Sequence, residues 1–486
     1  MELIEIMRHS MRTKERPNVI FLMLDTLTAD HLKMYGGGIR MKNLERMAGL
    51  GVTYKNAIAP GTYTLPSHTS LFTGRRVRGI KIFGKDPIKN YKENTDPLLM
   101  KNRFVGERDM TLAMRMSYLG YKTALLSNNP FVTPATGLGQ GFSFIKSIFV
   151  EKKVETHKAS LSLIGNDAAR ESLIRLAYYL SRFIPEKRLD RLYLELRNTL
   201  NKKFGKEADF YSLDQGAELT NRIADDYLSK TGERDHFMFI NYMEAHEGYP
   251  TNMVTERYVS QDRWMYLSRL IEHDDVQVLK KAYAKRLEYL DRKIGEALEM
   301  FKKRGILENA LVIATSDHGQ AFGEHGQLYH SLFPYNEISK VPLVVAKYLG
   351  GKQVAEKEVV ERSVSISALN ESIVNVGYRK TDIIDGALRR DSFVFSDHVG
   401  LSDVWDITLL RLLKGRSKHA EQIYKAKLKY NNFATAIYFG KHKLVHYYNK
   451  MPDELYDLEQ DPKEAENILG KNRELARRML KANSAA

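Results

Sequence analysis

The chain has 486 residues, 43% of them hydrophobic and 28% charged, and it contains no cysteine. This length suits one large domain with a smaller one, or two to three average domains, and the composition is ordinary for a globular protein. The lack of thiols excludes disulfide bonds and thiolate metal sites. The sequence holds no apolar run near the roughly 18 residues that span a bilayer. Its first residues lack the apolar segment of a secretory signal, so we expect a cytoplasmic protein.

The formal net charge is +15, with Lys and Arg spread along the whole sequence. That spread favours a solvated surface over an anionic macromolecular partner. Because the sequence has neither zinc-finger spacing nor the aromatic motif of an RRM, we expect no nucleic-acid partner. The basic stripe between Arg411 and Lys429 leaves peripheral contact with a membrane or a glycan as the alternative to a solvated helix face.

Short apolar runs alternate with helical patterns along the chain. The first run, from Asn18 to Asp25 (NVIFLMLD), is typical of a strand buried on both faces. Similar runs follow near Leu125, Phe239, Ile313, Val344 and Phe395. Between them, one helical pattern ends at Gly120, and another places apolar residues at three- and four-residue steps from Asp275 to Gly305. The alternation predicts an α/β fold with a large, mainly parallel sheet sandwiched by helices.

Two regions depart from this alternation. Residues 152–235 are helical and charged, and we interpret them as an insertion. Near the end of the chain, TAIYFGKHKLVHYYN predicts two antiparallel strands joined at Gly440 and Lys441, with a last helix that ends near Leu480. We therefore expect an N-terminal tail (1–16), a main α/β domain (17–400) and a small C-terminal α+β subdomain (401–486).

Acidic and histidine side chains follow three of the apolar runs directly. Asp25 ends the first run, His246 follows FINYMEA, and Asp317 and His318 follow LVIATS. Singly, a helix cap, a loop hydrogen bond or a structural histidine would explain each of them. Because ligands of open parallel sheets bind beyond the carboxyl ends of the strands, we expect these residues to share one site.

A fourth group comes from the stretch GTYTLPSHTSLFTG, which predicts a helix that begins at Thr64. Threonine and serine beside a helix-starting proline are also common as simple caps. A helix start presents free backbone N–H groups to a bound anion. Together with two aspartates and a histidine, the hydroxyl predicts a divalent-metal site, which suits zinc, manganese or magnesium better than calcium. Such a metal lowers the pKa of a bound hydroxyl and makes it a nucleophile.

Five stretches resemble the sulfatase branch of the alkaline phosphatase superfamily, in the order of the family, between about residues 17 and 469. They are RPNVIFLMLDTLTADHLKMYG, NAIAPGTYTLPSHTSLFTGR, YLDRKIGEALEMFKKRGILENALVIATSDHGQAFGEHG, LYHSLFPYNEISKVPLVV and DELYDLEQDPKEAENI. The resemblance implies an alkaline-phosphatase-like fold, with a small C-terminal subdomain carrying an antiparallel sheet. It implies a hydrolase that acts on an anionic sulfate or phosphate ester.

The resemblance also assigns roles. It implies one divalent metal (Ca, Mg, Mn or Zn), because no second Asp-His-His set stands at the spacing of two-zinc phosphatases. The metal ligands would be Asp25, Thr64, Asp317 and His318. Thr64 falls on the nucleophile position. His246 and His330 fall where the family holds the substrate's oxygens or assists the leaving group.

Several positions depart from the family pattern. Sulfatases convert Cys or Ser at the nucleophile position to formylglycine, and Thr64 cannot give that aldehyde, so we expect no formylglycine. His68 replaces the signature arginine, beside Ser67, and we include it among the candidate catalytic residues. Thr26 replaces the second acid of an Asp-Asp pair, and Gln320 replaces a glutamate that often follows Asp-His-Gly.

Three interpretations remain open. The first is a sulfatase-like ester hydrolase that uses Thr64 as a metal-activated nucleophile and forms a covalent intermediate. The second is a phosphodiesterase, phosphonate hydrolase or phospho-group transferase, since related phosphodiesterases and phosphoethanolamine transferases use an unmodified threonine. The third is a non-catalytic protein that binds anionic glycans or lipid head groups.

Overall fold

The computed structural model describes residues 16–76, 105–106, 109–148, 213–247, 273–330, 333–378, 393–399, 433–448 and 451–485. Residues 1–15 of the expected tail, residues 152–212 of the expected insertion and the basic stripe at 411–429 lie outside these ranges. Within the described ranges, no helix combines the length and apolar character needed to cross a membrane.

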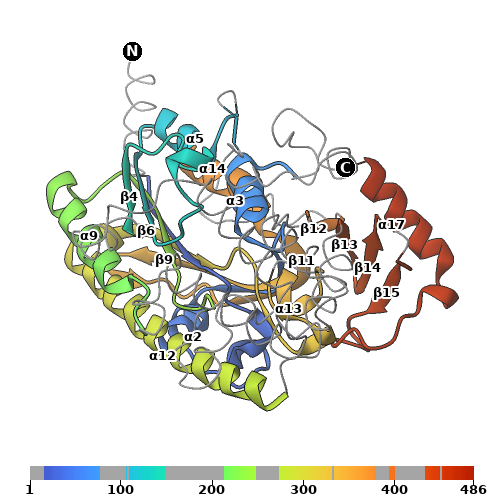
Figure 1. The fold of residues 1–486 in the computed structure, drawn as a ribbon. Coiled ribbons are helices and arrows are strands. Elements are labelled where there is room, and N and C mark those ends of the chain that lie inside the picture. The colour runs from blue at the N-terminus through green and yellow to red at the C-terminus, as the bar shows by residue number, and fades with distance from the viewer. Residues whose placement is uncertain are drawn as a thin grey trace, which may run out of the picture.

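A nine-stranded sheet runs through the main domain (Figure 1). Its order is β11 (Glu358–Ser365), β2 (Val52–Ile58), β9 (Lys340–Leu349), β6 (Asn309–Thr315), β1 (Asn18–Leu24), β5 (His236–Tyr242), β3 (Lys122–Ser127) and β4 (Phe144–Ser147), with β10 (Lys352–Gln353) beside β9. The pairs on both sides of β1 are parallel, whereas β9 runs antiparallel to β6 and β2. The sheet is therefore mainly parallel, as the sequence predicts.

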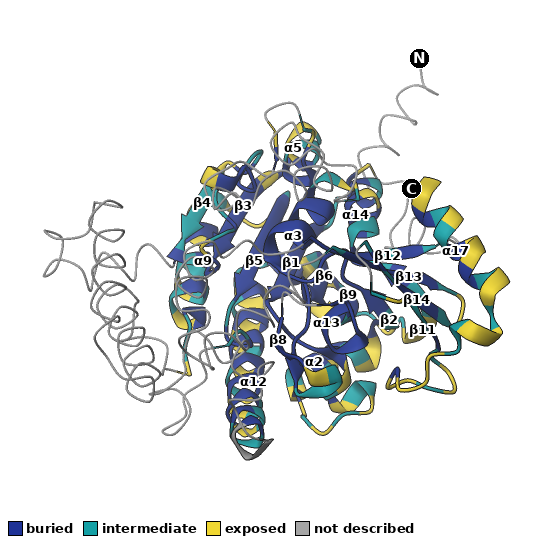
Figure 2. Ribbon diagram, turned by 45° about the vertical axis from the view of Figure 1, so that its right-hand side comes forward, coloured by how far each residue is buried: buried dark blue, intermediate teal, exposed yellow. Residues whose placement is uncertain are grey.

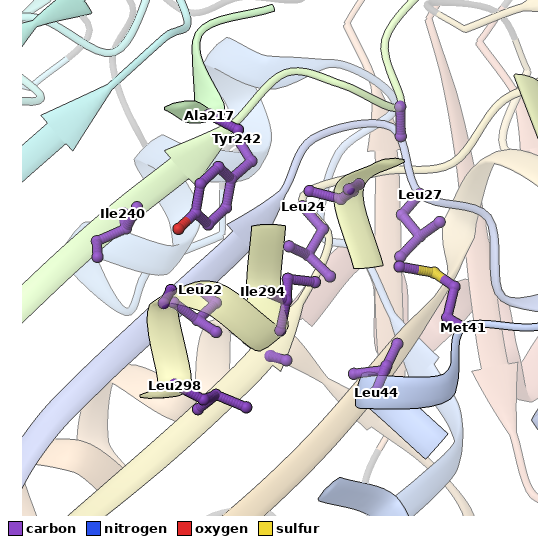
Figure 3. Close-up of a cluster of buried hydrophobic side chains, with 14 of the residues drawn as sticks. Leu22, Leu24, Leu27, Met41, Leu44, Ala217, Ile240, Tyr242, Ile294 and Leu298 are labelled. Carbon is purple, nitrogen blue, oxygen red and sulfur yellow. The ribbon is translucent and has the colours of Figure 1, made fainter. Parts of the chain in front are cut away.

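Helices cover both faces of this sheet because its central strands are apolar on both sides. On β1, Leu22 and Leu24 contribute to one buried cluster and Phe21 and Met23 to another. The first cluster includes residues of α2 (Lys42–Leu50), α9 (Ala217–Thr231) and α12 (His273–Lys303) (Figure 3). The second includes residues of α3 (Thr64–Thr73), α5 (Leu112–Tyr118) and α14 (Leu369–Gly377). Figure 2 shows the buried strands between helices that are exposed on their outer sides, whereas α3 is buried over most of its length.

The helical pattern predicted from Asp275 to Gly305 is confirmed as α12. All eight apolar residues at the predicted steps are buried: Val276, Leu279, Tyr283, Leu287, Leu290, Ile294, Leu298 and Phe301. Each such side chain contributes about 1.5–3 kcal/mol when it leaves water. Helix α9 belongs to the stretch expected as an insertion, but it packs against α12 and β3 as a regular helix of the main domain.

A separate antiparallel sheet forms the C-terminal part. It contains β12 (Val394–His398), β13 (Ala434–Phe439), β14 (His442–Tyr447) and β15 (Glu454–Asp457), and α17 (Arg473–Ala485) packs on it. The predicted hairpin is confirmed, with Gly440 at its turn in the left-handed region (φ +56°). The interpretation of the run near Phe395 as a strand of the parallel sheet is wrong. That run is β12, which pairs with β13, because a short apolar run carries no information about its partner.

Short elements complete the described chain. They are α13 (Asn336–Ser339), the pair β7 (Ala321–Phe322) and β8 (Leu328–Tyr329), and 3-10 turns at Ala29–His31, Lys33–Tyr35, Pro134–Thr136, Ile306–Glu308, Glu324–Gly326, Ile366–Ala368 and Leu469–Lys471.

A buried ion pair of the C-terminal part binds the main domain through Asn336 of α13. The Lys443 ammonium lies 2.6 Å from the Glu464 carboxylate, and both side chains are fully buried. Asn336 of α13 donates its backbone N–H to Glu464 and accepts from Lys443 through its side-chain oxygen. Because α13 also contacts the loop after β6, with Gly319 donating to the Ile338 carbonyl, this polar junction supports the carboxyl end of the central sheet.

Replacing Lys443 with methionine should lower the free energy of unfolding by about 3–5 kcal/mol, because Glu464 would remain buried without its cation. Chemical denaturation measures this loss. The double variant Lys443→Met/Glu464→Gln removes both charges and should recover most of it. A single variant as stable as the wild type would contradict this account of the junction.

Candidate active site

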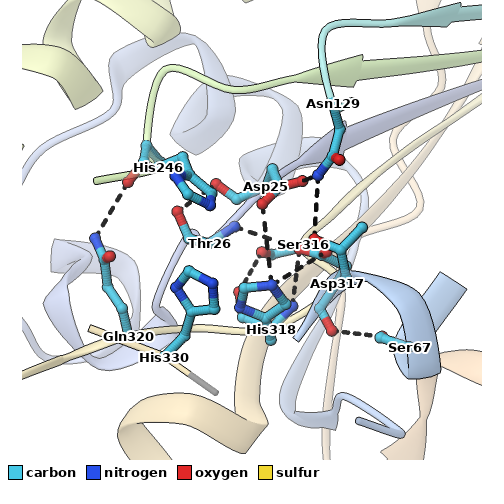
Figure 4. A network of polar contacts seen from close by, with 12 residues as sticks. Asp25, Thr26, Ser67, Asn129, His246, Ser316, Asp317, His318, Gln320 and His330 are labelled. Atoms are coloured by element: carbon cyan, nitrogen blue, oxygen red, sulfur yellow. Dashed lines mark hydrogen bonds and ion pairs between the residues drawn. The ribbon is translucent and has the colours of Figure 1, made fainter. Parts of the chain in front are cut away.

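The candidate site lies beyond the carboxyl ends of three adjacent strands (Figure 4). Asp25 directly follows β1, Asp317 and His318 follow β6, and His246 stands in the turn after β5. One ligand atom each from Asp25, Asp317 and His318 lies within 4.8 Å of the other two, and all three side chains are fully buried. The structure thus brings together residues about 290 positions apart in the chain, because β5, β1 and β6 are neighbours in the sheet.

Thr64 reaches this cluster from the first residue of α3. The side-chain amide of Asn129 donates to the Thr64 hydroxyl at 3.1 Å and to Asp25 Oδ2 at 2.7 Å. One amide group therefore holds the hydroxyl beside the carboxylate. The side chain of the N-cap residue Tyr63 accepts no hydrogen bond from the first turn of α3. It therefore does not cap the first backbone N–H groups of this helix.

Asp25, Asp317 and His318 each turn one potential ligand atom toward the other two. Within the described part of the chain, Asp25 Oδ1, Asp317 Oδ2 and His318 Nε2 have no hydrogen-bond partner. His318 Nε2 lies 3.3 Å from Asp317 Oδ2 and 4.0 Å from Asp25 Oδ1. His318 Nδ1 lies 3.0 Å from the Gly319 carbonyl, which favours a proton on Nδ1 and leaves Nε2 as a ligand.

Burial makes this cluster electrostatically costly without a cation. Desolvation, followed by the nearby Asp317, raises the pKa of Asp25 to about 6. Desolvation likewise raises the pKa of Asp317 to about 7 and lowers the pKa of His318. Buried carboxylates are usually paired or bound to metals, and mixed oxygen and nitrogen ligands suit a divalent ion. The residues present therefore fit the metal that the sequence predicts, with Asp25, Asp317 and His318 as ligands and the Thr64 hydroxyl beside them.

His68 lies beneath the cluster, one turn into α3. Its Nδ1 lies 3.1 Å from the Thr64 carbonyl and 3.4 Å from Asp317 Oδ2, and its ring packs edge-on against Phe72 and Phe239. Burial lowers the pKa of His68 to about 3, so the ring is neutral. It cannot supply the positive charge of an arginine, and its contacts are those of a residue that positions Thr64 and Asp317.

Three other predicted residues support the loops of the site. Ser67 donates its hydroxyl to the Asp317 carbonyl at 2.6 Å. Thr26 donates its backbone N–H to Asp317 Oδ1 and its hydroxyl to the Asp25 carbonyl. It does so in the left-handed region (φ +63°), which is rare for a β-branched residue and stores backbone strain. Gln320 donates its side-chain amide to the carbonyl of Ala245, next to His246.

His246 and His330 come together on one side of the cluster. Their rings lie 5.0 Å apart between centroids, and the His330 ring lies 4.5 Å from the His318 ring. The His246 side chain is 23% exposed, whereas Asp25, Asp317 and His318 are fully buried. Glu247 joins the two histidines, with Oε2 at 3.2 Å from His246 Nδ1 and 3.1 Å from His330 Nδ1.

The sequence analysis misses Asn129, Asn241 and Glu247. Asn129 follows the apolar run of β3, so the rule that identified Asp25 would have found it as well. Asn241 interrupts the apolar run of β5, and its amide lies 3.4 Å from Asp25 Oδ2. Nothing in the sequence distinguishes Glu247 from the many surface glutamates, because its position beside His330 arises only in the folded chain.

Known proteins of one family are similar to this chain. A family model described as Sulfatase matches residues 17–375. An N-acetylglucosamine-6-O-sulfatase of Bacteroides thetaiotaomicron is 23% identical over an alignment covering 94% of this chain and 83% of that protein. An arylsulfatase of Clostridium perfringens is 20% identical, with 93% and 90% covered.

Solved structures show the same fold. The phosphonate monoester hydrolase of Silicibacter pomeroyi aligns at a TM-score of 0.61 and 15% identity, covering 97% of this chain and 96% of that one. The corresponding enzyme of Agrobacterium radiobacter aligns at 0.60 and 17% identity, covering 97% and 95%. The resemblance drawn from the five sequence stretches is confirmed, and the chain belongs to the sulfatase family.

Proposed function

We propose that this protein is a metal-dependent hydrolase of sulfate or phosphate esters that uses unmodified Thr64 as its nucleophile. The observation that carries the proposal is the shared amide of Asn129, which places the Thr64 hydroxyl beside Asp25. A divalent cation held by Asp25, Asp317, His318 and the Thr64 hydroxyl would lower the pKa of that hydroxyl and offset the charge of the ester oxygens.

Thr64 begins the reaction by attacking sulfur or phosphorus in line with the ester oxygen. After the Thr64 hydroxyl has lost its proton to water, the Oγ1 bond to that atom forms as the bond to the ester oxygen breaks. The backbone N–H groups at the start of α3 face the anion. His246 gives a proton to the departing oxygen, whereas burial lowers the pKa of His330 to about 3 and leaves its ring neutral, as a contact for the ester oxygens. Water then cleaves the covalent ester on Thr64, and the same histidine takes up a proton.

His68, Ser67 and Thr26 hold these groups in position. Ser67 and Thr26 bond to Asp317 from two directions, and the His68 ring bridges Thr64 and Asp317. The Thr64 hydroxyl must lie in line with the leaving oxygen, and these fixed neighbours hold it there. This raises the reaction rate, because small displacements of a reacting group lower the rate by large factors.

The relatives support both ester classes. Sulfatases and phosphonate monoester hydrolases occur among the proteins similar to this chain, so sulfate, phosphate and phosphonate esters are all candidates. The rival function is a non-catalytic protein that binds an anionic group at the same site. The neutral His68 in place of the family's arginine favours the rival, whereas the open ligand atoms around Thr64 favour the enzyme.

Replacing Thr64 with alanine should lower kcat by about 10³-fold or more, because loss of a covalent nucleophile removes the chemical step. Thr64→Ser keeps a hydroxyl at the same helix start and should retain measurable turnover. The assay follows nitrophenol release from nitrophenyl sulfate, nitrophenyl phosphate, bis-nitrophenyl phosphate and nitrophenyl phenylphosphonate with Zn²⁺, Mn²⁺, Mg²⁺ or Ca²⁺. Equal rates for the wild type and the alanine variant, with every combination of substrate and metal, would support the non-catalytic rival.

Metal should stabilise the protein more at pH 8 than at pH 5.5. The pKa values of about 7 for Asp317 and about 6 for Asp25 in the metal-free protein mean that protons compete with the cation as pH falls through this range. A metal at 100 times its Kd adds about 2.7 kcal/mol, which appears as a rise in Tm by differential scanning fluorimetry.

Asp317→Asn should abolish most of this rise. Asp291→Asn is the matched control, because Asp291 is a buried carboxyl on α12 that binds the start of α2 instead of the site. A metal-induced rise that is the same at both pH values, or that survives in Asp317→Asn, would contradict the assignment of these ligands.

A further inference from the structure

The Glu247 carboxylate lies between the two histidines of the site. Its Oε2 atom is 3.2 Å from His246 Nδ1 and 3.1 Å from His330 Nδ1, so one oxygen is close to both rings. A carboxylate at this distance favours the positively charged form of a neighbouring imidazole. The charged form costs less hydration at His246, whose side chain is 23% exposed, than at His330, whose side chain is 9% exposed. Glu247 is therefore best placed to support a proton on His246.

The contacts of His246 also decide which ring nitrogen faces the pocket. His246 Nδ1 lies 3.4 Å from the backbone carbonyl of Glu247, in addition to its contact with the Glu247 carboxylate. Because a carbonyl only accepts hydrogen bonds, this contact places a proton on Nδ1. The Nδ1 edge of the ring is thus held by Glu247, and Nε2 remains for the substrate.

The loop after β5 holds the main chain of His246. The buried Arg286 of α12 donates to the His246 carbonyl at 3.2 Å, and Gln320 donates to the Ala245 carbonyl at 3.1 Å. These bonds fix the backbone, whereas Glu247 fixes the side chain. The His246 ring extends from this loop toward Asp25 (Figure 4), and its charge acts to lower the pKa values of Asp25 and Asp317. The ring therefore reaches the pocket that holds Thr64.

From this geometry we propose that Glu247 is a positioning residue, which holds His246 so that Nε2 gives its proton to the departing ester oxygen. The inference rests on the proposed function and deepens it. The N–H bond at Nε2 breaks as the bond from the ester oxygen to sulfur or phosphorus breaks, and the released alcohol gains the proton. The water that cleaves the covalent ester on Thr64 returns a proton to Nε2. The Nδ1 proton stays beside Glu247 in both steps.

A positioned acid indicates the class of ester that the site accepts. Nitrophenolate is a stable anion and leaves without a proton, whereas an alkoxide is a poor leaving group and needs one. The contact between Glu247 and His246 is therefore of use with esters of alcohols and of little use with esters of acidic phenols. We expect alcohol esters to be the substrates for which this site is built.

The test compares three leaving groups on the same acid. The substrates are the nitrophenyl, phenyl and benzyl esters of sulfate and of phenylphosphonate, with product release followed by liquid chromatography. Glu247→Gln keeps the size of the side chain. It should lower kcat by about 10²-fold for benzyl esters and by less than about threefold for nitrophenyl esters, because a general acid contributes about 10²–10⁴-fold to the rate. Glu247→Asp keeps the charge and should recover part of the loss.

Glu244→Gln is the matched control from the same loop. Glu244 is a buried glutamate that accepts hydrogen bonds from the backbone N–H groups of Gln215 and Ala217, at the start of α9. This variant should leave the ratio of the rates for the three esters at the wild-type value. Circular dichroism checks that each variant is folded.

A double variant shows whether Glu247 acts through His246. His246→Ala should show the same dependence on the leaving group as Glu247→Gln. The combination of both changes should be no slower than His246→Ala alone, because residues that act as a unit are not additive. An equal loss of rate for all three esters in Glu247→Gln, no loss for any of them, or additive losses in the double variant overturns the proposal.

Thr64→Ala judges the proposed function separately. If this variant hydrolyses the esters as fast as the wild type while Glu247→Gln keeps its dependence on the leaving group, the nucleophile assignment fails and the role of Glu247 stands. A wild type that hydrolyses none of the esters overturns both.

Discussion

Three buried side chains dominate this structure, and among the described residues their facing atoms have no hydrogen-bond partner. Asp25, Asp317 and His318 turn one atom each toward a common point and away from water. Such a cluster is unfavourable in a folded chain unless a cation compensates it. The strand order β6, β1 and β5 brings these three residues to one edge of the sheet. The loops that follow the strands and the start of α3 surround the place where their atoms meet.

Neutral groups support the two aspartates. Asn129, Ser67 and Thr26 bind the two aspartates or their carbonyls, and His68 is kept neutral by burial. Positive side chains in these places would pair with the carboxylates and compete with a metal. The family's arginine position is thus occupied by a residue that holds the site together without adding charge. In the proposed function, the positive charge that binds an anion would come from the metal and from the start of α3.

The C-terminal sheet takes part in the same arrangement. Its buried Lys443–Glu464 ion pair is hydrogen-bonded to Asn336 of α13, and α13 in turn binds the loop that carries Asp317. The small sheet and its helix therefore contribute to the site through packing, although the described residues of this sheet supply none of the candidate ligands.

The sequence by itself determined the α/β class, the long helix α12, the C-terminal hairpin and most members of the site. These follow from local information, since apolar periodicity fixes an element's type and a polar residue after an apolar run marks a strand end. Tertiary structure alone decided that β12 joins the small sheet, that α9 packs as a regular helix, and that Glu247 lies beside His246 and His330. The physical reason is that strand partners and charge clusters arise from contacts between residues far apart in the chain, and local spacing does not record them.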